Sequence, residues 1–115
     1  MPKTLMGIKV ERMDEGAVIK LSGRLDMNTS PDLRKTALAL YTRRNCRSLI
    51  IDFANVSHID TAGLATLLEI QLTARERCAH LTLSALNENA RYLIEVNRLT
   101  GLLGIVDSAR EKLTA

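Results

Sequence analysis

The sequence has few aromatic residues: two tyrosines, one phenylalanine and no tryptophan among 115 residues. We therefore expect an aliphatic core, and the stacking surfaces that bind single-stranded nucleic acids are scarce. The net charge is also small, at +3 with both histidines neutral. A charge of this size indicates a nucleic-acid or membrane-binding surface only where basic residues cluster, so no direct nucleic-acid partner is predicted.

Cysteine is nearly absent as well. Cys46 and Cys78 lie far apart without a CxxC pair, and there are only two histidines, so no metal site is predicted. The sequence also has no GxGxxG or P-loop motif, and no cofactor is predicted. We expect both cysteines to be small apolar side chains in a reducing compartment. The chain shows no secretory signal and no apolar run of membrane-spanning length, which predicts a cytoplasmic protein without membrane insertion.

The remaining composition is that of an ordinary globular protein. Hydrophobic residues make up 46% of the sequence and charged residues 25%, which excludes a disordered chain. No internal repeat or Pro/Gly-rich linker divides the sequence. We therefore predict a single domain over residues 1–115.

The first half of the chain alternates before it changes period. Apolar residues alternate with polar ones over 6–11 and 17–25, and the turn signal at 14–16 predicts an antiparallel hairpin. Ser30 followed by Pro31 indicates an N-cap and the first turn of a helix, with Arg43 and Arg44 in its last turn. Its expected apolar face is Leu33, Ala37, Leu40 and Tyr41.

The second half alternates strands with helices. A run at 48–54 predicts a central strand buried on both faces, and a helix should follow from about Asp60 to Arg77. The apolar stripe of that helix should be Leu64, Leu67, Leu68 and Leu72. A strand is expected at 81–86, followed by a helix that Asn87 caps and that carries Ala90, Leu93, Ile94 and Asn97 on one face. A last strand at 102–106 and a terminal helix with a Ser108–Glu111 capping box complete the predicted order. This order predicts an α/β fold with a mixed, mostly parallel sheet of about five strands flanked by helices.

The junction "IDTAG" joins the central strand to the second helix. Asp60 is placed to cap the helix by accepting a hydrogen bond from the Ala62 or Gly63 amide. Thr61 would then be the first helical residue, and Gly63 would let another backbone or a partner approach closely. One interpretation is a well-capped helix whose glycine packs against a neighbour. The other is a phosphorylation site at Thr61, where a charge of about −2 would alter the surface that a partner meets.

Three stretches, "LSGRLD", "LIIDFANVSHID" and "DTAGLATLL", resemble the STAS domain family, which includes the bacterial anti-sigma factor antagonists. The resemblance extends from about Met6 to Leu113. Its most specific motif is Asp-Ser/Thr-Ser/Thr-Gly-Leu, and Asp60, Thr61, Gly63 and Leu64 match it. A second match is the "GRLD" that ends at Asp26.

The resemblance implies a switchable binding module. In this family an unphosphorylated antagonist binds an anti-sigma factor, often itself a serine/threonine kinase, and so frees sigma. Phosphorylation of the hydroxyl after the motif's aspartate breaks this complex, and a phosphatase restores it. Carried over to this chain, the acceptor is Thr61, and the partner-binding residues are Asp26, Asp60, Thr61, Ala62 and Gly63.

The chain departs from the antagonist pattern at two positions. Thr61 stands where most antagonists have serine, and Ala62 stands where a second hydroxyl is usual. Both departures resemble the STAS subunit of Mla-type lipid-transport ABC transporters, whose helix start docks on the ATPase without phosphorylation. An ABC-transporter ATPase is therefore the alternative partner.

Two further residue groups have interpretations of their own. His58, Asp60 and Thr61 imitate a catalytic triad, but neighbouring residues at a strand end diverge, so no catalytic residue and no enzyme is predicted. Arg43, Arg44 and Arg47 either meet phosphates or form a solvated helix end.

Overall fold

The computed structural model describes residues 7–107. Its strands form one sheet in the order β1-β2-β3-β4-β5, in which β1 is antiparallel to β2 and the other neighbours are parallel. This confirms the predicted mixed, mostly parallel sheet. The predicted strand residue Met6 and the Ser108–Glu111 capping box lie outside the described residues. The elements are β1 (Gly7–Arg12), β2 (Gly16–Leu25), α1 (Ser30–Arg43), β3 (Ser48–Ile59), α2 (Thr61–Glu76), β4 (His80–Ser84), α3 (Glu88–Val96) and β5 (Gly104–Val106).

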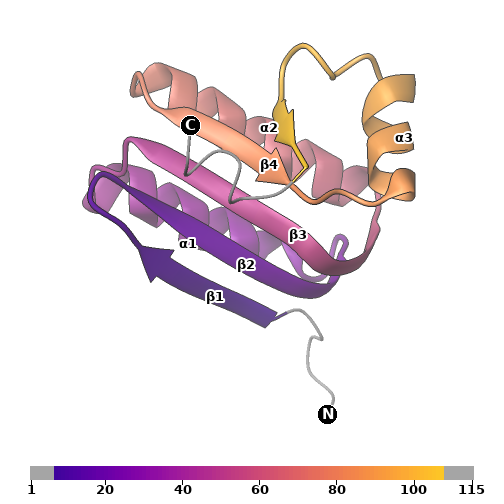
Figure 1. The fold of residues 1–115 in the computed structure, drawn as a ribbon, viewed down its shortest axis with the longest axis horizontal. Coiled ribbons are helices and arrows are strands. Elements are labelled where there is room, and N and C mark those ends of the chain that lie inside the picture. The colour runs from indigo at the N-terminus through magenta and orange to yellow at the C-terminus, as the bar shows by residue number, and fades with distance from the viewer. Residues whose placement is uncertain (1–6, 108–115) are drawn as a thin grey trace.

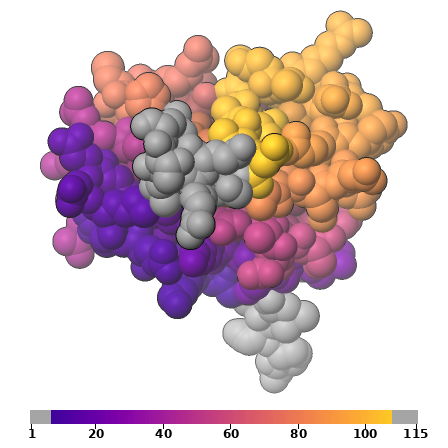
Figure 2. Space-filling model, viewed as in Figure 1, coloured from indigo at the N-terminus to yellow at the C-terminus, as the bar shows by residue number. Residues whose placement is uncertain are grey.

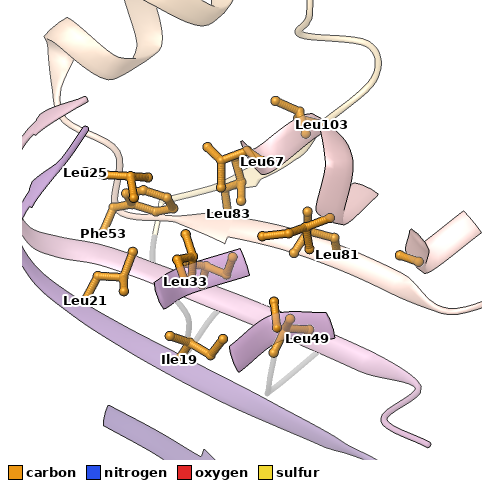
Figure 3. Packing of buried hydrophobic residues seen from close by; sticks show 14 of the residues in the cluster. Ile19, Leu21, Leu25, Leu33, Leu49, Phe53, Leu67, Leu81, Leu83 and Leu103 are labelled. Carbon is orange, nitrogen blue, oxygen red and sulfur yellow. The ribbon is translucent and has the colours of Figure 1, made fainter. Parts of the chain in front are cut away.

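The helices α1 and α2 lie side by side behind the sheet, and α3 lies at one end of it (Figure 1). Between the two long helices and the sheet lies a core made mostly of leucine, isoleucine and alanine (Figure 3). The Tyr41 hydroxyl in this core donates to the His80 carbonyl at 2.7 Å. Within residues 7–107, no helix has both the length and the apolarity to cross a bilayer.

The central strand β3 is buried on both faces at Leu49–Ile51, as predicted, but it continues to Ile59, beyond the predicted end at residue 54, and Ala54 and Asn55 are exposed. Leu49 and Ile51 point into the helix-covered core, while Ile50, on the opposite face, is also buried. The β2–β3 register shifts twice, once after Lys20 and once after Gly23, and each shift places an extra residue in β3. Bulges of this kind bend a strand and redirect the side chains beyond them, and no sequence signal predicted them.

The predicted N-cap of α1 was wrong by one residue. Ser30 is the first helical residue, and the cap position belongs to Thr29. The Thr29 hydroxyl donates to the Arg24 carbonyl at 2.7 Å and accepts from the Asp26 amide at 2.9 Å. It therefore fixes the β2–α1 turn and does not cap the helix. Thr29 and Ser30 are adjacent and both are favoured at N-caps, so the sequence alone did not show which of them precedes the helix.

The bounds of α2 agree with the prediction, but its apolar stripe was partly wrong. Leu64 and Leu67 are buried, whereas Leu72 is 59% exposed and the buried positions beyond Leu67 are Ile70 and Ala74. The helix packs against both the sheet and α1. Its buried face is therefore rotated around the helix axis relative to the predicted leucine stripe.

Two smaller predictions also require correction. Cys46 is buried as expected, but Cys78 is exposed and has φ of 54°, just beyond α2. The helix C-terminus needs a left-handed residue there, which carries the thiol outward. Asn97, placed by periodicity on the apolar face of α3, is exposed at the C-cap.

Candidate partner-binding site

The carboxyl ends of β2 and β3 bring Asp26 and Asp60 to the same edge of the sheet. Leu25 pairs with Ile59 as the last residue pair of the two strands, and the Asp60 amide donates to the Leu25 carbonyl at 3.2 Å. This edge lies at the right of Figure 1, where the β2–α1 and β3–α2 turns meet. The structure confirms the expectation that Asp26 lies on the same rim as Thr61.

Asp60 caps α2. Its side chain is an acceptor for the Gly63 amide at 2.9 Å, and its carbonyl accepts from the Leu64 amide at 3.0 Å. Of the two amides proposed from the sequence, the structure selects that of Gly63. The Asp60 carboxylate is thus committed to the helix start and orients the residue that follows it.

Gly63 is buried and packs against the end of β2 in the same chain. A Cβ at this position would lie 2.6 Å from the Leu25 carbonyl oxygen and 3.0 Å from the Leu25 Cγ. The distance to the carbonyl oxygen is shorter than real Cβ atoms show, so the glycine allows α2 to start against the end of β2. Gly63 therefore acts on the rim by fixing where Thr61 and Ala62 lie.

Thr61 is the first residue of α2 and is exposed, and the neighbouring Ala62 is half-buried. Among the described residues, the Thr61 hydroxyl takes part in no hydrogen bond. The hydroxyl therefore lies at the positive end of a 16-residue helix and is open to solvent.

Asp26 holds the turn between β2 and α1. Its Oδ1 accepts from the amides of Asn28 at 2.9 Å and Thr29 at 3.1 Å, and the Thr29 hydroxyl, which makes its shorter hydrogen bond to the Arg24 carbonyl, lies 3.2 Å from the same oxygen. The Arg24 Nε lies 3.7 Å from Oδ2. Partial burial acts to raise the pKa of Asp26, but these hydrogen bonds and the Arg24 charge outweigh it, so the pKa lies below its usual value. Asp26 is therefore a fixed negative charge at neutral pH.

Met27 lies on the same rim, and it was not singled out from the sequence. It follows Asp26 in the turn and is 71% exposed. A large apolar side chain beside fixed charges is the type of residue that protein interfaces favour. The available signal was a methionine within the otherwise polar stretch "DMNTSPD".

Residues of the imitated triad do not form a relay. His58 is half-buried and pairs with Arg24 across the β2–β3 ladder. In the described part of the chain, no hydrogen bond joins it to Asp60 or Thr61. Residues 7–107 also hold no group of three His, Cys, Asp or Glu side chains suited to a metal ion.

The start of α3 completes the rim. Asn87 accepts from the Ala90 amide at 2.9 Å, as predicted for its cap, and its side-chain amide donates to the Val56 carbonyl at 3.4 Å. In the space-filling view, α3 in orange rests against the pink end of β3, at the right of the molecule (Figure 2). The starts of three helices therefore surround the site.

The sequence and fold match those of known proteins over nearly their whole length. Residues 8–106 match the family described as "Mlab, STAS domain". The anti-sigma F factor antagonist of Paenibacillus polymyxa is 23% identical over 107 residues, which cover 93% of this chain and 92% of that protein. The structure of an anti-sigma factor antagonist assigned in Thermotoga maritima superposes with a TM-score of 0.86 at 14% identity, over 93% of this chain and 92% of that one. The Bacillus cell fate determinant SpoIIAA in its phosphorylated form has a TM-score of 0.75 at 18% identity, over 94% and 96%.

Proposed function

Since this chain belongs to the STAS domain family, we propose that it is a cytoplasmic regulatory protein that works like an anti-sigma factor antagonist. It binds an anti-sigma factor kinase through the rim of Asp26, Asp60, Thr61 and Ala62. Phosphorylation of Thr61 by that kinase releases it, and a phosphatase returns it to the binding form. The relative in Paenibacillus is named for antagonism of this kind.

The observation that carries this proposal is the state of the Thr61 hydroxyl. It is exposed at the start of α2 and takes part in no hydrogen bond within the described chain. A kinase can therefore reach it without unfolding the helix. The phosphorylated SpoIIAA structure supports the proposal, because it shows that a protein of this fold accommodates a phosphate.

A phosphate at Thr61 would act mainly on the partner. The positive end of α2 favours an added anion by about 0.3–1 kcal/mol, while the neighbouring Asp60 and the fixed charge of Asp26 repel it. These effects oppose each other within the fold, so the domain stays folded. A partner matched to the unmodified rim meets about two additional negative charges and binds less tightly.

The test uses the purified protein, its cognate kinase and ATP. Mass spectrometry should find one phosphate, located at Thr61. Thr61→Ala should stay folded, gain no phosphate and remain bound to the kinase in the presence of ATP. Thr61→Asp should bind weakly, although one carboxylate only partly imitates a phosphate.

Ser57→Ala is the matched control, because the exposed Ser57 hydroxyl lies on the same strand end but donates to the Gly23 carbonyl at 3.2 Å. It should be phosphorylated and released like the unmodified protein. Phosphate found at Ser57 or Thr66, or unchanged binding after modification of Thr61, would contradict the switch.

A transporter subunit is the second candidate. The description of the matching family names Mlab, and Ala62 stands where a second hydroxyl is usual in antagonists. In this case the same rim docks on an ABC-transporter ATPase without phosphorylation. Copurification with such an ATPase, and loss of that complex in Thr61→Asp without any phosphate on the unmodified protein, would select this function over the first.

A further inference from the structure

The amino end of the sheet, opposite the proposed binding rim, gathers exposed arginines. It lies at the left of Figure 1, where the β1–β2, α1–β3 and α2–β4 connections meet. The sequence suggested only a short basic run at the end of the first helix. The fold adds arginines from β1 and α2 to that run. We call this surface the arginine end, and its members are Arg12, Arg43, Arg44, Arg47, Arg75 and Arg77, all exposed.

Backbone hydrogen bonds join the three connections at the arginine end, and a shallow hollow lies between two of its arginines. Arg47 lies at the centre, because its amide donates to the Glu15 carbonyl at 2.7 Å and its carbonyl accepts from the His80 amide at 2.9 Å. Arg47 and Arg77 line a common hollow of about 200 Å³ together with Asn45. Charges from separate parts of the sequence therefore share one surface.

The positive charge of the arginine end is not balanced locally. In the described part of the chain, ion pairs involve other basic side chains and none of these six. Among residues 7–107, the acids at this end are Asp14, Glu15 and Glu76, so six arginines leave three positive charges. Complementing helix dipoles accounts for arginines at the ends of α1 and α2. It does not account for Arg12 on β1 or Arg47 before β3.

Exposed apolar side chains border the arginine end. Met13, 36% exposed, follows Arg12 in the hairpin turn, and Leu72, 59% exposed, lies one turn before the end of α2. Leu102 is 45% exposed, and its carbonyl accepts from the Gln71 side chain at 2.5 Å. The aromatic ring nearest this end, Tyr41, is fully buried. Arginines with aliphatic neighbours and no exposed ring suit a lipid interface better than the stacked bases of single-stranded nucleic acid.

We propose that the arginine end is a docking surface for an anionic lipid bilayer. The arginines bind lipid phosphates from the side of the headgroups, and Met13, Leu72 and Leu102 contact the edge of the acyl region. No segment inserts across the membrane. This orientation holds the rim with Thr61 away from the bilayer and accessible to a protein partner. The inference goes beyond the proposed function, since it concerns the opposite end of the molecule.

Flotation with lipid vesicles tests the proposal. Each basic residue near an anionic surface contributes roughly fivefold to binding, so three net charges predict a preference of about 100-fold for vesicles of phosphatidylcholine with phosphatidylglycerol over phosphatidylcholine alone. Binding should fall as salt rises. Equal binding to both vesicle types, or no binding to either, would overturn the proposal.

Paired charge variants locate the surface. Arg47→Gln combined with Arg77→Gln should weaken binding to anionic vesicles by about 25-fold. The control is Lys9→Gln combined with Lys35→Gln, which removes the same charge from exposed positions on β1 and α1 outside the arginine end. The control should change binding by less than about threefold. Equal losses in the two variants would show general charge attraction and reject the site.

Two further measurements complete the test. Both variants should keep the circular dichroism spectrum and melting temperature of the unmodified protein, because the four side chains are exposed. A duplex DNA oligonucleotide should bind more weakly than anionic vesicles at the same salt. Tighter DNA binding with the same dependence on Arg47 and Arg77 would replace the bilayer with a nucleic acid. Kinase binding by the arginine variants tests the proposed function separately.

Discussion

At the scale of single residues, Gly63 has the strictest requirement in the binding rim. We predict that Gly63→Ala destabilises the fold by about 1–3 kcal/mol, as overpacking typically does. The new Cβ would meet the Leu25 carbonyl at 2.6 Å, and backbone cannot move aside as a flexible side chain can. This cost exceeds the gain of up to about 1 kcal/mol that alanine brings to a helix. Urea unfolding measures the difference.

The matched control for this substitution is Gly101→Ala. Nothing lies within 4 Å of a Cβ built at Gly101, and the residue is exposed in the loop before β5. Its unfolding free energy should change by less than about 0.5 kcal/mol. Similar effects at both glycines would show that Gly63 does not set the distance between α2 and β2.

Asp26 makes the stability of the fold depend on pH. Its pKa in the folded protein lies below the usual value, so its ionised form stabilises the fold above the unfolded pKa of about 3.9. This contribution is lost as the pH falls through the lower, folded pKa. We predict that Asp26→Asn lowers the melting temperature at neutral pH and that the difference from the unmodified protein shrinks below about pH 4. A difference that stays constant on acidification would contradict this assignment.

At the scale of elements, α2 offers a direct comparison of two leucines. Leu67 is fully buried, whereas Leu72 is 59% exposed. We predict that Leu67→Ala costs about 2–5 kcal/mol, while Leu72→Ala changes stability by less than about 0.5 kcal/mol. Both substitutions are chemically identical and lie on one helix, so helix propensity cancels. Chemical denaturation of the two variants provides the measurement. Equal losses of unfolding free energy would show that the buried face of α2 includes Leu72.

The elements themselves were largely predictable because their signals are local. Asp60 and Asn87 cap helices from positions that sequence alone identified, and alternation located β2 and β4. The errors had two different causes. Which residues of α2 are buried depends on how the helix packs against α1 and the sheet. At α1 the cause was local, because Thr29, which hydrogen-bonds to the Arg24 carbonyl, stands directly before Ser30.

At the scale of the whole molecule, the rim was predictable and the arginine end was not. Parallel strands place their carboxyl ends together, so Asp26 and Asp60 had to meet once the order of elements was known. Arg12, Arg47 and Arg77 come from three separate parts of the sequence. Their meeting depends on the hairpin and on two crossovers, which no local pattern describes.

The opposed charges of the two ends make the protein an electric dipole. The first turns of α1 and α3 carry Asp32 and Glu88 and join Asp26 and Asp60 at one pole, while the arginine end forms the other. Such a molecule rotates in the field of a charged partner before any contact forms. A phosphate on Thr61 would enlarge this dipole and so change the rate of encounter as well as the fit of the complex. Added salt would suppress that change in rate and leave the steric part of the switch in place.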